Sequence, residues 1–393
     1  MTPAARVQTT IGLLDRVIEA ALAKGPPADR ILAEWFRANR FAGSKDRRAI
    51  RELVYAAIRL CGPIPQTGRA AMLALAENDP ALLLQFDGST YGPAPVDEGE
   101  LVAEPGIAPA WLVQRLAESD IEGGEAAALL ERAPLDIRVN ALKADRASLE
   151  LPLPGEALPS AQGLRLPLGT SVEQWDAHRD GLIEIQDCGS QLACEAVEAR
   201  PGETVIDLCA GAGGKTLALA AAMRGQGMLI AADTDRGRLS RLPPRAERAG
   251  ALVSEAVLLD PGREADRLAA WREGGDAVLV DAPCSGTGTW RRNPEARWRL
   301  DEPALERLLA LQRRLLEIAA GLVRPGGRLV YVTCSLLDEE GPGQIEAFLA
   351  GHPDWRADPP ALALGRARGP GIRLTPSQDE TDGFFIARLE KPC

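Results

Sequence analysis

The sequence is poor in the features that mark several protein classes. It has only two histidines, His178 and His352, which lie far apart, so neither a histidine-based triad nor a metal site is expected. Its seven cysteines form no CxxC pair, which argues against a disulfide scaffold or zinc ribbon and fits a reducing cytoplasm. No apolar run reaches the roughly 18 residues of a membrane span, and the N-terminus lacks the pattern of a secretory signal.

Basic residues are also in deficit, which at first sight disfavours a nucleic-acid partner. The 393 residues include 45 Lys and Arg against 56 Asp and Glu, giving a net charge of −11. Phosphate binding, however, needs only a local basic surface. Two basic runs, within 37–59 and 291–299, are candidates, but each run could equally be a solvated helix face. Charge alone therefore decides nothing about the partner.

The length and the apolar pattern predict three domains, within the expectation of two or three for a chain of this size. Residues 1–134 have apolar positions three and four apart, which predicts helices. Residues 135–182 contain short strand-like pieces, and we expect no helix between them. From 183 to 393, nearly continuous apolar strands alternate with helices. That order predicts an α/β domain with a mostly parallel sheet covered on both faces.

Functional residues are expected directly after the strands of this third domain, because ligands bind beyond the carboxyl ends of parallel strands. Cys284 and Cys334 end two strands that could be neighbours, and two thiols at one sheet edge favour chemistry over a structural role. The acids and thiols at these positions are Asp207, Cys209, Asp233, Asp260, Asp281, Cys284 and Cys334.

The segment DLCAGAGGKT (207–216), between a strand and a helix, predicts a loop that binds a ligand through backbone amides. Its GGKT ending suggests a nucleotide-phosphate loop, but that motif requires glycine where Cys209 stands. Asp233 ends the next strand, where an acid holds ribose hydroxyls in nucleoside-binding sheets. Asp235 is a competitor that could instead cap a helix. Asp260 could contact the adenine of a nucleoside ligand, although a lone aspartate at the end of a strand is more often a turn residue.

Taken together, these motifs resemble the Nop/Sun family of RNA cytosine-5 methyltransferases, and most closely its bacterial RsmB type, which modifies 16S rRNA. The helical stretch 43–59 is similar to the NusB-like domain of that type. The family usually has Ala-Pro where this chain has Gly211 and Ala212, a change that still allows close backbone approach but removes a proline constraint. The other matching segments are DIRVNALK at 136–143, IQDCGSQLA at 185–193, DAPCSGTG at 281–288, YVTCS at 331–335 and TDGFFIARLEK at 381–391.

The resemblance implies a Rossmann-like class I methyltransferase domain with an antiparallel final strand, an all-α NusB-like domain before it and a small α+β module between them. It also implies methyl transfer from S-adenosylmethionine to carbon 5 of cytosine in RNA. Cys334 would attack carbon 6 of the base and Cys284 would assist release, while Asp281 is placed to bind the cytosine ring. The expected partner is 16S rRNA or an early small-subunit assembly intermediate, with no membrane partner, and the expected state is a cytoplasmic monomer.

Two sets of binding residues follow from these expectations. RNA contacts are expected from Arg47, Arg48, Arg138, Asn140, Arg291 and Arg292. Cofactor contacts are expected from Cys209, Ala210, Gly211, Ala212, Gly213, Gly214, Lys215, Asp233, Arg238, Asp260 and Asp281.

Two other functions stay open on the sequence. A DNA cytosine-5 methyltransferase would use the cysteine of its Pro-Cys motif, here Cys284, as the nucleophile. A non-catalytic RNA-binding assembly factor would keep the methyltransferase fold without the activity, and the altered loop at Gly211 and Ala212 is the only support for that reading.

Overall fold

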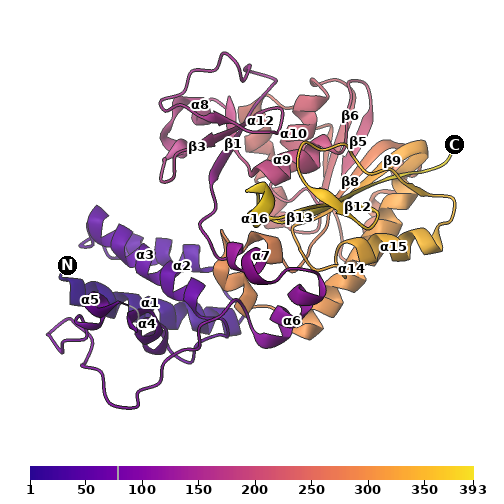
Figure 1. Ribbon diagram of the computed structural model, residues 1–393. Helices are drawn as coiled ribbons and strands as arrows, with labels where there is room; N and C mark the ends of the chain where they lie inside the picture. Colours follow the sequence, from indigo (N-terminus) through magenta and orange to yellow (C-terminus); the bar gives the residue numbers. More distant parts are fainter. Residues whose placement is uncertain (78) are drawn as a thin grey trace. The chain divides into compact units, whose positions relative to one another are not determined.

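The computed structural model describes residues 1–77 and 79–393, which form two compact units (Figure 1). The first unit contains Met1–Arg132 together with Thr289–Asp301, and the second contains Ala133–Gly288 and Glu302–Cys393. The segment 289–301 thus belongs to the first unit, although it lies in sequence between two elements of the second. The three expected domains, with boundaries after residues 134 and 182, stay a prediction. Two compact units do not show which segments of the chain are separate domains.

The first unit is helical, as its apolar spacing predicts. Helix α1 begins where the Thr2 side chain accepts a hydrogen bond from the Ala5 amide at 3.2 Å. None of the helices within 1–77 and 79–393 is long and apolar enough to cross a membrane. The helices of this unit are α1 (Pro3–Leu22), α2 (Ala28–Ala38), α3 (Ser44–Leu60), α4 (Gly68–Ala76), α5 (Pro80–Leu83), α6 (Ala110–Glu118) and α7 (Gly123–Ala128).

The second unit opens with a small antiparallel sheet of order β2–β3–β1–β4. A short helix, α8 (Asp176–Arg179), lies between β3 and β4, so the expectation of no helix there was wrong. Its one turn was missed because four residues carry too little periodicity to show a helix. The strands are β1 (Leu135–Val139), β2 (Glu156–Ala157), β3 (Gly163–Leu166) and β4 (Ile183–Ile185).

The larger sheet, nine-stranded within the described part of the chain, has the order β11–β12–β13–β9–β8–β5–β6–β7, with β10 paired to β13. Strands β7, β6, β5, β8 and β9 are parallel, and β13 runs antiparallel to β9, as expected for the final strand. The strands are β5 (Thr204–Asp207), β6 (Met228–Asp233), β7 (Glu255–Leu258), β8 (Gly275–Asp281), β9 (Val323–Thr333), β10 (Arg356–Ala357), β11 (Arg366–Arg368), β12 (Gly371–Leu374) and β13 (Phe384–Glu390).

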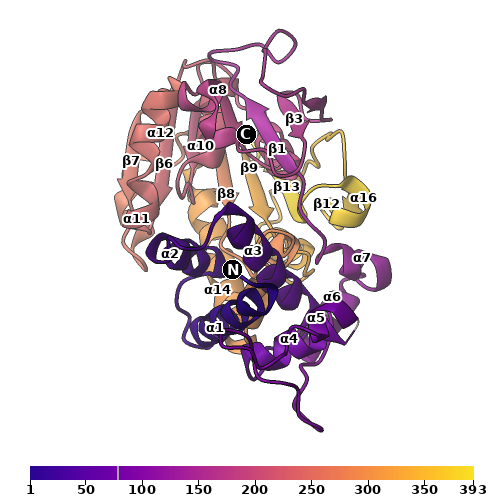
Figure 2. The same cartoon turned by 90° about the vertical axis from the view of Figure 1, so that its left-hand side faces the viewer.

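Helices cover both faces of this sheet, because alternate strand residues point to opposite sides (Figures 1 and 2). Val205 packs in one core with α9, α10 and α12, while its neighbour Ile206 packs in another with α14 and α15. The helices are α9 (Cys188–Glu195), α10 (Gly214–Ala222), α11 (Arg236–Leu239), α12 (Leu242–Ala249), α13 (Glu264–Arg267), α14 (Glu302–Leu322), α15 (Pro342–Gly351) and α16 (Pro376–Asp379).

Candidate active site

Two thiols meet at the carboxyl edge of the large sheet. Cys284 lies in the loop after β8, and Cys334 follows the last residue of β9, the parallel neighbour of β8. The two Sγ atoms are 3.4 Å apart and share a hydrogen bond. That hydrogen bond and burial raise the pKa of Cys284 well above the usual range for a thiol. Cys284 therefore keeps its proton at neutral pH, in contact with the sulfur of Cys334.

Lys215 and Asp281 form an ion pair at the same edge. Lys215 Nζ lies 2.7 Å from Asp281 Oδ2, and it also lies 5.7 Å from the ring centroid of Phe384. Burial opposes the charge on Lys215, but Asp281 and nearby thiols, Cys194 and Cys334 among them, raise its pKa above the usual range. The Lys215 ammonium therefore stays charged within this ion pair, and Cys334 is among the groups that interact with its charge.

The loop between β5 and α10 has the open backbone that its small residues predict. Gly211 has a φ of +55° and Gly213 a φ of +87°, both in the left-handed region that favours glycine. A side chain at Gly213 would come within 2.2 Å of Leu242 Cδ1, whereas one at Gly214 would meet nothing within 4 Å. The start of α10 therefore leaves room for a ligand, and the amides at a helix start suit an anionic group.

Two aspartates flank this loop. Asp233 receives the Gly211 amide on Oδ2 and the Asp235 amide on Oδ1, each at 2.7 Å. Asp207 accepts from Thr216 Oγ1 at 2.7 Å, but its Oδ1 is buried and has no partner among the described residues. An open glycine turn with an orphaned buried acceptor beside it fits S-adenosylmethionine, which carries an ammonium and ribose hydroxyls.

Other predicted cofactor residues lie around the same loop. Asp235 caps α11 by accepting a hydrogen bond from the Arg238 amide at 2.9 Å. Helix capping was the alternative role expected of this residue from the sequence. The Arg238 guanidinium lies against Gly211, since a Cβ there would be 2.3 Å from Nη2. Asp260 is exposed in the turn after β7. Burial, and then the nearby carboxylates, raise the pKa of Cys209 well above its usual range, so Cys209 stays a neutral thiol.

The residues predicted to bind RNA divide into exposed and buried groups. Arg48 is exposed on α3, and Arg47 beside it is partly exposed. Arg138 and Asn140 are instead buried, and they bond to Gln186 and to the carbonyls of Gly181 and Ala249, respectively. Their role in the structure is to hold β1 in place. Arg291 is buried within the helical unit, while Arg292 beside it is partly exposed.

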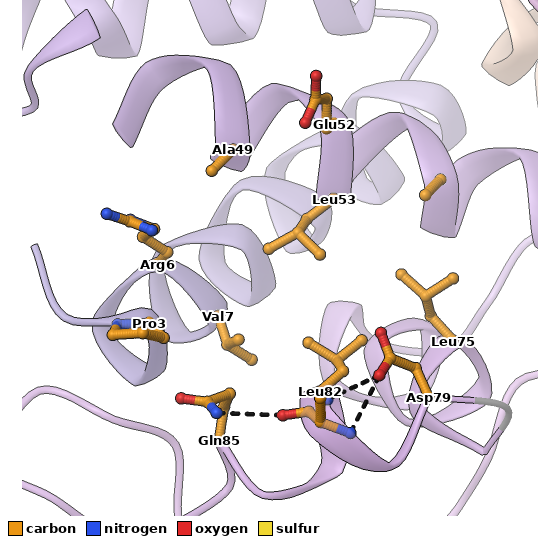
Figure 3. Close-up of a pocket in the computed structure, with 12 residues that line it drawn as sticks. Pro3, Arg6, Val7, Ala49, Glu52, Leu53, Leu75, Asp79, Leu82 and Gln85 are labelled. Carbon is orange, nitrogen blue, oxygen red and sulfur yellow. Dashed lines mark hydrogen bonds between the residues drawn. The ribbon is translucent and has the colours of Figure 1, made fainter. Parts of the chain in front are cut away.

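A hollow in the helical unit carries no comparable chemistry. It has a volume of about 490 Å³ and lies between α1, α3, α4 and α5 (Figure 3). Asp79, one of its few charged residues, accepts from the Ala81 and Leu82 amides at the start of α5. The carboxylate of Asp79 is thus used as a helix cap, and the lining contains neither a thiol nor a histidine.

Sequence reasoning missed the residue that joins the two cysteine loops. Glu340 is buried and bonds to Ser285 and Ser335, the residues that directly follow Cys284 and Cys334. Its neighbour Glu339 is an acid of the same type, and no pattern in LLDEE shows which of the two points inward. Only the packing of β9 and α14 distinguishes them.

Comparisons with known proteins agree with this geometry. A sequence model of the family described as 16S rRNA methyltransferase RsmB/F matches residues 194–390. The chain is 36% identical over 301 residues to a probable ribosomal RNA small subunit methyltransferase B of Synechocystis sp., with 72% of this chain and 66% of that protein covered. It is 37% identical over 294 residues to the ribosomal RNA small subunit methyltransferase B of Xylella fastidiosa, with 72% and 67% covered.

A solved structure extends the likeness to the whole chain. The crystal structure of PH0851 has a TM-score of 0.75 and 26% identity, and the match covers 100% of this chain and 99% of that one. The curated relatives are longer, since the chain spans about two thirds of their length.

Proposed function

Because the chain belongs to the RsmB/F family of 16S rRNA methyltransferases, we propose that it methylates carbon 5 of a cytosine in RNA. S-adenosylmethionine is the cofactor of the family, and when bound it supplies the electrophilic methyl group. The observation that carries the proposal is the pair of thiols 3.4 Å apart at the sheet edge. A single nucleophile would account for attack on the base, whereas a second thiol in contact with the first suits the release step.

Cys334 is the proposed nucleophile. Carbon 5 of cytosine is a weak nucleophile, but addition of a thiolate to carbon 6 makes carbon 5 electron-rich enough to accept a methyl group. The thiolate form needs a positive neighbour, and Lys215 provides one within electrostatic reach. Asp281 holds that ammonium in place with one oxygen at 2.7 Å, and its second oxygen is available to the ring of the base. The target nucleotide would have to leave any helix to reach this edge.

Release of the product is assigned to Cys284. After transfer, the proton on carbon 5 must leave before the bond from Cys334 to carbon 6 can break. A general base takes that proton, the electron pair of the C–H bond re-forms the 5,6 double bond, and the Cys334 thiolate leaves, with Cys284 assisting this release. Its sulfur contacts that of Cys334, which places it beside the base once the adduct has formed.

The substrate is proposed to be the small-subunit ribosomal RNA. The curated relatives are described as acting on it, although they are longer than this chain. The helical unit would serve as a NusB-like RNA-binding domain, with Arg48 and Arg47 on α3 as phosphate contacts. A monomer in the cytoplasm is expected to carry out the reaction.

The division of labour between the thiols is tested by two single substitutions. Cys334→Ala should abolish both methyl transfer and any covalent RNA adduct. Cys284→Ala should instead accumulate an adduct that survives denaturing electrophoresis. Cys393→Ala, at the exposed C-terminal residue, is the matched control and should behave like the unsubstituted protein. Turnover retained by Cys334→Ala would refute the assignment of the nucleophile.

The same variants discriminate the alternatives. If Cys284→Ala removes the adduct and Cys334→Ala traps it, the roles are reversed, as a DNA cytosine-5 methyltransferase would have them. Methyl incorporation into RNA but not DNA separates the two substrates. Failure to bind S-adenosylmethionine by calorimetry would favour the non-catalytic assembly factor. Bisulfite sequencing of RNA from cells lacking the protein would identify the modified cytosine.

A further inference from the structure

A buried carboxylate lies directly behind the two thiols. The side chain of Glu340 is fully buried, and its two oxygens have four donors between them. Oε1 accepts from the Ser285 amide at 2.8 Å and from Gln312 Nε2 at 2.9 Å. Oε2 accepts from the Ser335 hydroxyl at 2.6 Å and from the Ser285 hydroxyl. A buried charge with this many partners is held in one position, because losing any of them would leave a polar group unpaired.

The donors come from the two loops that carry the cysteines. Ser285 directly follows Cys284, and Ser335 directly follows Cys334. Direct bonds also join the same loops: the Gly288 amide donates to the Cys334 carbonyl at 3.0 Å, and the Leu336 amide donates to Thr287 Oγ1 at 2.9 Å. The Ser335 hydroxyl lies 3.1 Å from the hydroxyls of both Thr287 and Ser285. Glu340 is the point at which both loops attach to one side chain. Its position, together with the direct bonds, therefore sets how far apart the loops hold the two sulfur atoms.

We propose that Glu340 is a positioning residue that sets the contact between Cys284 and Cys334 and so controls release of the methylated product. This assignment rests on the proposed function, in which Cys334 forms the adduct and Cys284 resolves it. Attack on the base needs Cys334 alone, whereas release needs the sulfur of Cys284 to stay in contact with that of Cys334. Loosening the link between the loops should therefore slow release more than attack.

Glutamine at 340 is the sharpest test, because it keeps the size of the side chain and removes the charge. All four partners of Glu340 are donors, two to each oxygen. The NH2 group of a glutamine would replace one oxygen and would therefore face two donors that it cannot accept from. Ser335→Ala is a second variant, which removes the hydroxyl that bonds to Glu340 and, with it, the bonds of that hydroxyl to Ser285, Thr287 and the Leu337 amide. Glu346→Gln is the matched control, since it removes the same charge from an exposed position on α15.

In multiple-turnover assays with RNA, Glu340→Gln should lose up to about 100-fold in rate, as expected for reacting groups displaced by a fraction of an ångström or more. The first methyl transfer in a single turnover should change much less, and covalent protein–RNA adduct should accumulate. S-adenosylmethionine affinity should stay close to that of Glu346→Gln, whereas the melting temperature should fall, because the amide leaves buried donors unpaired. Equal losses in the first transfer and in release would overturn the proposal, because a general structural defect would not separate the two steps.

A second readout does not depend on methyl transfer. Phenylarsine oxide bridges two thiols that lie close together, so the full-length protein should bind it through Cys284 and Cys334, and either Cys→Ala variant should lose that binding. Glu340→Gln should bind it about 10-fold more slowly, and Ser335→Ala, which also loosens the two loops, should slow binding too. Unchanged binding in Glu340→Gln would overturn the proposal.

Failure of the two ideas can be told apart. If the full-length protein transfers no methyl group to RNA but arsenical binding still depends on Glu340, the proposed function fails and only the positioning of the thiols stands. If both cysteine variants behave as proposed while Glu340→Gln matches Glu346→Gln in both assays, the role of Glu340 fails alone.

Discussion

At the scale of single residues, Asp207 links stability to pH. Burial raises the pKa of this carboxyl to about 7, against the lowering effect of the Thr216 hydrogen bond. In the unfolded chain its pKa is about 3.9. Between these two values the folded protein keeps a proton that the unfolded chain has lost, so stability falls as the pH rises through this window. Above about pH 7 the loss is complete, and it reaches a few kcal/mol at about 1.4 kcal/mol per pH unit.

Asp207→Asn should remove this pH dependence. The amide oxygen can still accept from Thr216, and the new NH2 group adds a cost that does not vary with pH. Urea unfolding at pH 5 and pH 8 should show the variant gaining stability relative to the unsubstituted protein as the pH rises. Asp266→Asn, at an exposed side chain, controls for the lost charge. A constant difference between Asp207→Asn and the unsubstituted protein at the two pH values would show that Asp207 titrates normally.

At the scale of elements, the cofactor loop is braced from α12. Arg245 Nη1 donates to the Ala212 carbonyl at 2.6 Å, and its Nη2 lies 2.9 Å from Glu184 Oε2 in β4. Glu184 is almost fully buried, so the guanidinium is held on both sides. Arg245 bonds to Ala212, the position at which the family usually has proline. The bond restricts the backbone of a loop whose glycines would otherwise allow many conformations.

Arg245→Ala should therefore weaken S-adenosylmethionine binding about 10-fold, the loss expected for one charged hydrogen bond. Adding Ala212→Pro should recover part of that affinity, because proline restricts the same backbone from within. Calorimetry on the single and double variants measures both effects, with the exposed Arg241→Ala as control. An affinity unchanged in Arg245→Ala would mean that the loop needs no brace.

The long elements were predictable because burial on both faces leaves a clear apolar run. Strands β6 (Met228–Asp233) and β13 (Phe384–Glu390) coincide with the largely apolar runs MLIAAD and FFIARLE. The short strands β11 and β12 were missed, since three or four residues with arginines among them carry no such signal. The parallel pairing of β8 and β9 could be anticipated, and it brought the two thiols together as expected.

Side-chain burial was much harder to predict than strand position. Arg138 has a long charged side chain that suggests a surface contact, yet it is enclosed and bonded to Gln186 at 2.6 Å. Glu340 was overlooked for the same reason, because charge in a sequence indicates exposure by default. Both residues satisfy their buried charge through partners about 48 to 55 positions away, at Gln186 and Ser285. Such partners cannot be identified without the fold.

At the scale of the whole molecule, the helical unit is completed by a segment from far along the chain. Arg297, which is fully buried, donates to the carbonyls of Ile58 at 2.6 Å and Cys61 at 2.7 Å, at the end of α3. Trp298 packs in the same helical core. Residues 289–301 therefore cap α3 and close the core, so the N-terminal helices do not form a complete unit from residues 1–132 alone.

Arg297→Ala should accordingly destabilise the helical unit and leave the second unit intact. Carbonyls at the end of α3 lose their donor in a buried setting, which should cost about 3 kcal/mol or more. In hydrogen exchange on the full-length protein, amides of α3 should then exchange roughly 100-fold faster, while those of β5 and β8 stay protected. Arg313→Ala, at an exposed position on α14, should change neither region. Equal loss of protection in both units would show that they unfold together, and unchanged exchange in α3 would show that this helix does not depend on the segment 289–301.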